Sequence, residues 1–209
     1  MRSKGAEKIG ATLNSFFKPI LDLVDKHGGD VIKFSGDALT IVWPTTEYCP
    51  GDESGNSFVE TTSKMSTARC SRFVGRVAHK DDTTAALAAS RFCIALQALV
   101  PEIGKTPIED HHLTMHIGVG YGMVSLMQIG GLFGRWEYCL AGDALEQIAV
   151  AEPLAVSGET VLSPEARSLV EADLSLEDVD AGPGQPGFAK LLDERHRAVP
   201  CSKNPPGSS

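Results

Sequence analysis

The feature that most constrains this chain is a pair of short apolar runs joined by Gly36-Asp37. The runs cover residues 31–34 and 38–43 and have the length and composition of strands. Glycine and aspartate at the join favour a tight turn, because glycine tolerates positive φ and aspartate bonds its own backbone. The segment therefore predicts a β-hairpin with the Asp37 carboxylate at its tip and Lys33 four residues earlier.

The Asp37 carboxylate admits two interpretations. A Gly-Asp pair is common in turns for conformational reasons alone, which would make Asp37 a plain turn residue. Its own strands cannot bury this carboxylate, and Lys33 is close in sequence. The same residues are therefore also a plausible place to hold a metal-bound phosphate or another anion.

Four segments are predicted to be helices from apolar periodicity and from end signals. Glycine, proline and side-chain caps mark the ends, each by a known effect on the backbone. The helices are expected from about Ile9 to Val24 with an end at Gly28-Gly29, from Asp81 or Asp82 to Pro101, from a cap at Asp143 to Pro153, and from Ser163-Pro164 onward.

Strict apolar–polar alternation from Leu113 to Tyr121 predicts the clearest strand in the chain. Tyr121-Gly122 is expected to turn this strand into a second one over residues 123–129, which would make another hairpin. Further short strands are expected at three places. These are residues 136–140, residues 159–162, and an edge strand at residues 187–192.

The order helix, hairpin, helix, hairpin, strand, helix predicts helices packed on a largely antiparallel sheet. This is an α+β arrangement of the ferredoxin-like kind. Residues 45–80 lose periodicity and are rich in Thr, Ser, Gly, Asn and Glu, so we expect a long mobile insertion there. The main domain is expected to cover residues 1–172, and residues 173–209 to form a C-terminal extension with a disordered end.

Composition excludes several classes of protein. The 209 residues carry a net charge of −8 and no cluster of Lys or Arg, which argues against a non-specific nucleic-acid binder. No segment is predicted to cross a membrane and no signal peptide is evident, so we expect a cytoplasmic domain. The five cysteines are odd in number and lack a CxxC pair, which predicts free thiols, with Cys93 and Cys139 in the core.

Residues 28–39, Gly-Gly-Asp-Val-Ile-Lys-Phe-Ser-Gly-Asp-Ala-Leu, resemble the second metal-site hairpin of class III nucleotide cyclases. Residues 134–143 are similar to the first catalytic domain of the soluble, bicarbonate-responsive adenylyl cyclases. The resemblance covers about residues 5–44 and 82–170. It implies a βαββαβ core whose first strand, carrying the first metal-binding Asp, would precede the first helix; the chain begins at the approach to that helix.

The resemblance implies conversion of ATP to cyclic AMP and pyrophosphate, at an interface shared with a second cyclase domain. Two divalent cations, Mg²⁺ or Mn²⁺, would do most of the chemistry, bridged by two carboxylates. Asp37 would be the second of these carboxylates. Because the first is absent, the isolated chain is expected to be nearly inactive.

Lys33 and Leu140 are implied to line a second, pseudo-symmetric pocket. In a catalytic second domain, the lysine at the position of Lys33 contacts adenine. In a first domain it lies in the pocket where soluble cyclases bind bicarbonate, with Leu140 nearby. From the residues alone, a strand lysine with its amine in solvent explains Lys33 equally well.

Three positions after Gly142 favour first-domain character. Catalytic second domains carry an Asn and a transition-state Arg where this chain has Glu146 and Val150. Glutamate would repel phosphate and valine has no donor. The bicarbonate-binding Arg would fall at Ala149, which weakens the case for a bicarbonate response. A non-catalytic regulatory or dimerisation module therefore stays open, as does the less favoured guanylyl cyclase, because the base-contacting residues would come from the partner.

Other conspicuous residues have structural interpretations. Trp136 is expected to be a packing anchor, and Glu137 to have an interface or capping role. His116 is expected on the polar face of a strand and not in a zinc site. The glycines of the run from Gly118 to Gly122 are expected to permit close backbone approach at a dimer arm.

Overall fold

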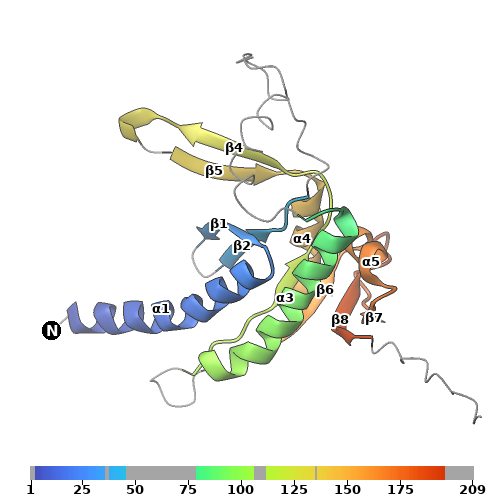
Figure 1. Ribbon diagram of the computed structural model, residues 1–209, viewed down its shortest axis with the longest axis horizontal. Helices are drawn as coiled ribbons and strands as arrows, with labels where there is room; N and C mark the ends of the chain where they lie inside the picture. Colours follow the sequence, from blue (N-terminus) through green and yellow to red (C-terminus); the bar gives the residue numbers. More distant parts are fainter. Residues whose placement is uncertain (1–2, 36–37, 46–78, 106–111, 135, 196–209) are drawn as a thin grey trace, which may run out of the picture.

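The computed structural model describes residues 3–35, 38–45, 79–105, 112–134 and 136–195 (Figure 1). The helices are α1 (Ser3–Lys26), α3 (Asp82–Ile103), α4 (Asp143–Leu154), α5 (Pro164–Val170) and the 3-10 turn η1 (Leu132–Gly134). The strands are β1 (Asp30–Ser35), β2 (Ala38–Val42), β3 (Ile117–Val119), β4 (Ser125–Gly130), β5 (Trp136–Ala141), β6 (Thr160–Leu162), β7 (Leu174–Asp178) and β8 (Ala189–Glu194).

The strands form one four-stranded sheet and two separate antiparallel ribbons. The sheet has the order β3-β6-β8-β7, in which only β3 and β6 run parallel. The ribbons are β1–β2 and β4–β5, and the β4–β5 ribbon extends away from the rest of the protein, as does the N-terminal half of α1 (Figure 1). The α+β class predicted from the sequence is confirmed.

Helices cover both faces of the four-stranded sheet. Leu162 on β6 belongs to the main core with α1, α3 and α5, whereas its neighbour Val161 packs with Ala151 and Ala155 at the C-terminal end of α4. Successive residues of a strand point to opposite faces of a sheet. It follows that α4 lies on the face opposite to α3.

The main core forms where α1 and α3 pack on each other and on the sheet. Phe16, Ile20 and Val24 recur at intervals of four residues on α1, and all three are buried. They meet Phe92 and Leu96 of α3, which are also buried. The apolar periodicity that predicted the first helix thus contains the residues that it buries, although Leu13 and Leu21 of the same pattern are exposed.

The prediction that no segment is apolar enough to cross a membrane is wrong for one helix. α3 has 22 residues and a mean hydropathy of 1.4 over an 18-residue window, which is enough by length and composition alone. Core helices of other proteins satisfy the same test. Seven residues of α3 are buried and it packs against α1, α5 and β8, which accounts for its apolar character.

Two predicted strand pairings are wrong. β3 and β4 do not form a hairpin, because β4 pairs with β5 whereas β3 pairs with β6. β8 is not an edge strand, because it lies between β6 and β7 and bonds to both. β7 has no counterpart in the prediction, and with β8 it extends the sheet beyond residue 172.

The helix ends agree with the prediction at two caps and differ at three positions. Asp81 caps α3 by accepting a 2.7 Å bond from the Thr84 amide, and Ser163 caps α5. Pro101 and Pro153 lie inside the last turns of their helices. Proline has a helical φ and forfeits only one hydrogen bond, so a helix can continue briefly past it. Asp143 is the first residue of α4 and Gly142 is its cap.

The glycines before β4 bring a helix close to a strand within the chain. A Cβ at Gly120 would lie 2.3 Å from the Ala144 carbonyl oxygen, and one at Gly118 would lie 2.7 Å from the Glu152 nitrogen. The partner in this close approach is therefore α4 itself. The sequence predicts this close backbone approach at a dimer arm, but at Gly118 and Gly120 the approaching backbone is that of α4 in the same chain.

Candidate functional site

The β1–β2 hairpin positions the residues that the sequence singled out. The two strands pair in antiparallel register, with Lys33 opposite Thr40 and Ser35 opposite Ala38. The predicted hairpin is confirmed up to these last described pairs. Gly36 and Asp37, which connect Ser35 to Ala38, lie outside the described residues, so the metal-ligand role of Asp37 stays a prediction.

The hairpin is anchored at its base and exposed toward its tip. At the base, the Trp43 indole Nε1 donates to the His27 carbonyl at 3.0 Å, and its ring packs on Phe92 with centroids 5.2 Å apart. At the other end Lys33 and Phe34 are exposed. The end of the hairpin nearest Asp37 is therefore available to a ligand or a partner.

Lys33 and Leu140 lie on different sheets. Lys33 is exposed on β1, whereas Leu140 is half-buried on β5, where it pairs with Leu126. Neither residue lines the two cavities described below. Their membership of one shared pocket therefore stays a prediction.

A cavity of about 290 Å³ lies beside the face of α4 that carries the diagnostic positions. Glu146 and Val150 line it from α4, together with Glu165 and Phe188. No Lys or Arg is among the described residues around it. Its two carboxylates would repel a triphosphate, and the Gln147 and Gln185 amides that also line it carry no positive charge to offset them. Ala149, on the same helix, is exposed and carries no donor.

Gln147 organises the start of α4 and was missed by the sequence reasoning. Its Oε1 accepts two hydrogen bonds of 2.8 Å, from the Tyr121 amide and from the Ser163 hydroxyl. It thereby ties α4 to the end of β3 and to the cap of α5. A polar residue three positions after Ala144 and four before Ala151, both buried, was the available signal.

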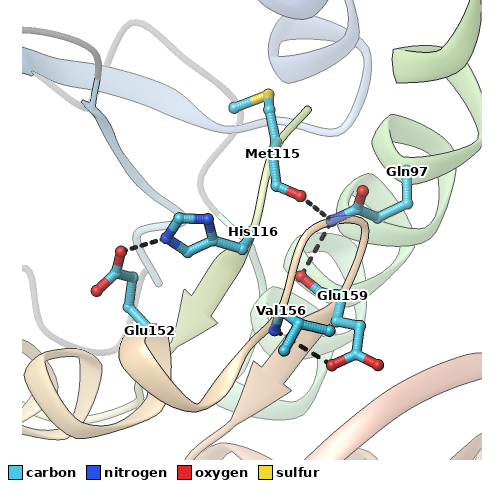
Figure 2. A network of polar contacts seen from close by, with 6 residues as sticks. All are labelled: Gln97, Met115, His116, Glu152, Val156 and Glu159. Carbon is cyan, nitrogen blue, oxygen red and sulfur yellow. Dashed lines mark hydrogen bonds and ion pairs between the residues drawn. The ribbon is translucent and has the colours of Figure 1, made fainter. Parts of the chain in front are cut away.

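A polar network joins β3 to α3 and α4 (Figure 2). The His116 Nε2 lies 2.6 Å from Glu152 Oε1, and both side chains are 47% exposed. On the other side, the Gln97 amide Nε2 donates to the carbonyls of Met115 and Glu159. His116 therefore lies beside an acid on α4, just before β3 begins.

The described residues do not by themselves form a metal site. No group of three or more His, Cys, Asp or Glu among them is placed to hold an ion. Cys93 and Cys139 are free, as predicted, but only Cys93 lies in the core, because Cys139 is half-buried on β5 and belongs to neither core cluster. Burial raises the pKa of the Cys93 thiol to about 12. A thiol with so high a pKa stays protonated, which fits a core residue.

Most of the chain matches the model of one protein family. Residues 1–182 match the model of the adenylate and guanylate cyclase catalytic domain. A curated relative, adenylate cyclase type 10 of Mus musculus, is 22% identical over 182 residues, or 87% of this chain. The chain spans only 9% of the length of that relative.

Solved structures of similar fold include both guanylate cyclases and adenylyl cyclases. The guanylate cyclase domain of RhGC from Catenaria anguillulae, in complex with GTP, gives a TM-score of 0.59 at 15% identity, over 90% of this chain and 86% of that one. The adenylyl cyclase CyaB from P. aeruginosa gives 0.58 at 17% identity, over 90% and 84%. At these identities the likeness shows the shared fold alone.

Proposed function

Because the chain belongs to the family of adenylate and guanylate cyclase catalytic domains, we propose that it is the first-type half of an adenylyl cyclase. It would convert ATP to cyclic AMP and pyrophosphate at an interface shared with a second cyclase domain. The observation that carries this proposal is the contrast between the exposed β1–β2 hairpin and the cavity beside α4, whose described lining contains no Lys or Arg.

The hairpin supports the metal half of the proposal. Asp37 would supply one carboxylate to Mg²⁺ or Mn²⁺, and Mg²⁺ characteristically combines few carboxylates with substrate phosphates and water. The hairpin is fixed at its base by Trp43. At its other end Lys33, Ser35 and Ala38 are exposed, although Leu39 beside them packs against the core. The carboxylate would therefore be presented beyond the core of this chain, where a partner domain can bring nucleotide.

The face of α4 supports the need for a partner. Glu146, Val150 and Glu165 surround a cavity that offers no positive charge from the described residues. Groups that stabilise the transition state must donate to the phosphate oxygens. The second domain would therefore supply those donors together with the contacts to the base.

The β4–β5 ribbon is a candidate arm for contact with that second domain. It extends from the body of the protein (Figure 1), and Ile129 and Phe133 are 56% and 92% exposed. Exposed apolar side chains on a projecting ribbon are typical of interaction surfaces. Trp136 and Glu137 belong to the same ribbon, in register with Gly130 and Ile129.

Adenylyl activity is favoured over guanylyl activity by the similarity to a curated adenylate cyclase. In the proposal the partner domain contacts the base of the nucleotide, so guanylyl activity is the second candidate.

Lys33 and Leu140 would line the pseudo-symmetric pocket, where bicarbonate would be the ligand. The alanine at position 149 weakens a bicarbonate response. We place the protein in the cytoplasm, in line with the soluble cyclases that it resembles.

A non-catalytic regulatory or dimerisation module is the alternative of a different class. Glu146 and Val150 favour it, because both replace groups that an active second domain needs. The two proposals differ in one property. A catalytic half must bind Mn²⁺–ATP once it is paired, whereas a module that only dimerises need not.

The test uses a longer version of the protein that includes the preceding segment, paired with its second domain. Asp37→Asn is expected to lower cyclic AMP production by at least about 100-fold, because one metal carboxylate is lost. Asp22→Asn is the matched control, since Asp22 lies exposed on α1 with Lys18 as its partner. Unchanged activity in Asp37→Asn would refute the metal assignment. Failure of the paired wild type to bind Mn²⁺–ATP in equilibrium dialysis would favour the non-catalytic module.

A further inference from the structure

A second and larger cavity lies at the base of the hairpin. It measures about 530 Å³ and is bounded by the last turn of α1, by His79, and by one face of α3. This volume is in the range of cavities that bind small organic ligands. Nothing in the proposed cyclase chemistry uses it.

Two histidines line this cavity, each with one ring nitrogen already committed. His27 Nδ1 lies 2.9 Å from the Leu23 carbonyl oxygen, and His79 Nε2 lies 3.2 Å from that of Gly28. A carbonyl only accepts, so these nitrogens must carry the protons. In the uncharged form of each ring, the other nitrogen is an acceptor, and no hydrogen bond to it is found among the described residues.

Two cations lie on the same cavity. Lys26 at the end of α1 has no ion-pair partner within the described part of the chain. Arg91 uses its Nε to bind Glu194 at 2.8 Å, and its side chain is 49% exposed. Its terminal amino groups are available for a bidentate contact with an anion. Asp25, which also lines the cavity, already interacts with another group of the protein.

The remaining wall is apolar. Leu87 and Ala88 on α3 lie between Thr84 and Arg91, at the spacing that puts all four on one helical face. A metal ion is a poor fit, since no group of three suitable ligands exists among the described residues. The cavity instead combines two cationic side chains and the Asp25 carboxylate with unused acceptors and a hydrocarbon surface.

We propose that this cavity binds a small organic anion that carries hydroxyl groups, of the sugar phosphate class. The anionic group would lie against Arg91 and Lys26, its hydroxyls would donate to the free nitrogens of His27 and His79, and its carbon skeleton would cover Leu87 and Ala88. Each part of the ligand is matched by a group on the cavity wall.

The position of the cavity connects it to the hairpin. The His27 carbonyl accepts from Trp43, and the His79 backbone amide donates to the Pro44 carbonyl at 3.0 Å. A ligand that holds both imidazoles would therefore hold the two ends of the hairpin together. The cavity is separated from the Ser35 end of β1 by the length of that strand, roughly 17 Å at the usual rise per residue. The site would thus be separate from the proposed metal site.

The test is isothermal titration calorimetry of the 209-residue chain with ribose 5-phosphate, ribose and inorganic phosphate in phosphate-free buffer. Ribose 5-phosphate is expected to bind with a Kd below about 1 mM, and each fragment at least tenfold more weakly. Lys26→Gln and Arg91→Gln should each weaken binding about tenfold, because each loses a charge-assisted contact. Lys18→Gln should leave it unchanged, since this lysine also lies exposed on α1 but pairs with Asp22.

Ala88→Phe provides an independent variant, because it fills the cavity without removing a charge. It should abolish binding while the far-ultraviolet circular dichroism and melting curve remain those of a folded protein. Three results would overturn the proposal: no binding of ribose 5-phosphate at about 10 mM, equal affinity for either fragment, or equal weakening by Lys18→Gln and Lys26→Gln. None of these results depends on cyclase activity, so the proposal can fail independently of the proposed function.

Discussion

The four-stranded sheet and the β1–β2 hairpin are built differently. Every residue of β6 is buried, and the sheet is covered on both faces by helices. No residue of β1 or β2 is fully buried, and β1 changes from half-buried at its base to exposed toward its tip. The sheet therefore carries the stability of the protein. The hairpin, which carries the proposed chemistry, packs on that framework only through partly buried side chains such as Leu39, Ile41 and Trp43.

The largest effect is expected from Phe92→Ala in α3. Phe92 is 2% exposed and packs against the rings of Trp43 and His27, so its loss leaves a cavity where the hairpin joins the core. Truncation of a buried phenylalanine typically lowers the free energy of unfolding by about 3–5 kcal/mol. Denaturant unfolding followed by circular dichroism measures this change.

Phe34→Ala is the matched control on the hairpin. Phe34 is 48% exposed, although its ring contacts Phe17 with centroids 5.4 Å apart. We expect a loss of about 1 kcal/mol or less, because little apolar area returns to water. Equal losses in the two variants would contradict the division into a stable framework and a weakly supported hairpin.

Gly120→Ala is expected to have the next largest effect. Its Cβ would lie 2.3 Å from the Ala144 carbonyl oxygen, so α4 and β3 would have to separate. Forced repacking of this kind typically costs about 1–3 kcal/mol. Thermal unfolding reports the loss.

Gly10→Ala should have the opposite sign. Gly10 lies in α1 and a Cβ there would meet nothing within 4 Å. Alanine is favoured over glycine in a helix by about 1 kcal/mol. If both alanine variants destabilise the protein to the same extent, close approach of α4 to β3 is not the reason for the glycine at position 120.

Some local features of the fold were predictable from the sequence, whereas the hairpin expected at Tyr121-Gly122 and the long-range pairings were not. The β1–β2 hairpin and the caps at Asp81 and Ser163 depend on neighbouring residues, and all are confirmed. Alternation predicted a strand over residues 113–121, but the structure has only Ile117–Val119 as a strand. Alternation also could not name the partner of this strand, because pairing depends on packing with distant parts of the chain. β7 escaped detection because its sequence, Leu-Ser-Leu-Glu-Asp, is short and half polar.

The candidate site shows the same limit. The sequence alone was enough to single out Asp37, Glu146 and Val150 and to argue what their side chains can and cannot bind. The cavity that Glu146 and Glu165 both line could not be predicted from the sequence. Glu165 lies 19 positions after Glu146, and the two meet only because α5 folds back beside α4. Lys26 and Arg91, 65 positions apart, likewise line one cavity only because α1 and α3 pack together.

The smallest effect, and one that depends on pH, is expected from Lys190→Met on β8. Lys190 Nζ lies 3.1 Å from Glu159 and 3.0 Å from Glu177, and its hydrogen bond lowers the pKa of Glu159 below the usual value. A carboxyl whose pKa is depressed on folding stabilises the protein above its unfolded pKa, near 4.5, and this contribution is lost as pH falls through the folded value.

Lys190→Met should therefore melt below wild type at pH 7, and the gap between the two melting temperatures should narrow as pH falls below about 4. Methionine keeps the hydrocarbon length, so the comparison isolates the charge. The same substitution at Lys18, whose pair with Asp22 is far more exposed, should produce a smaller gap at pH 7. A gap for Lys190→Met that is constant from pH 7 to pH 3 would show that the ion pair with Glu159 does not contribute to the stability of the sheet.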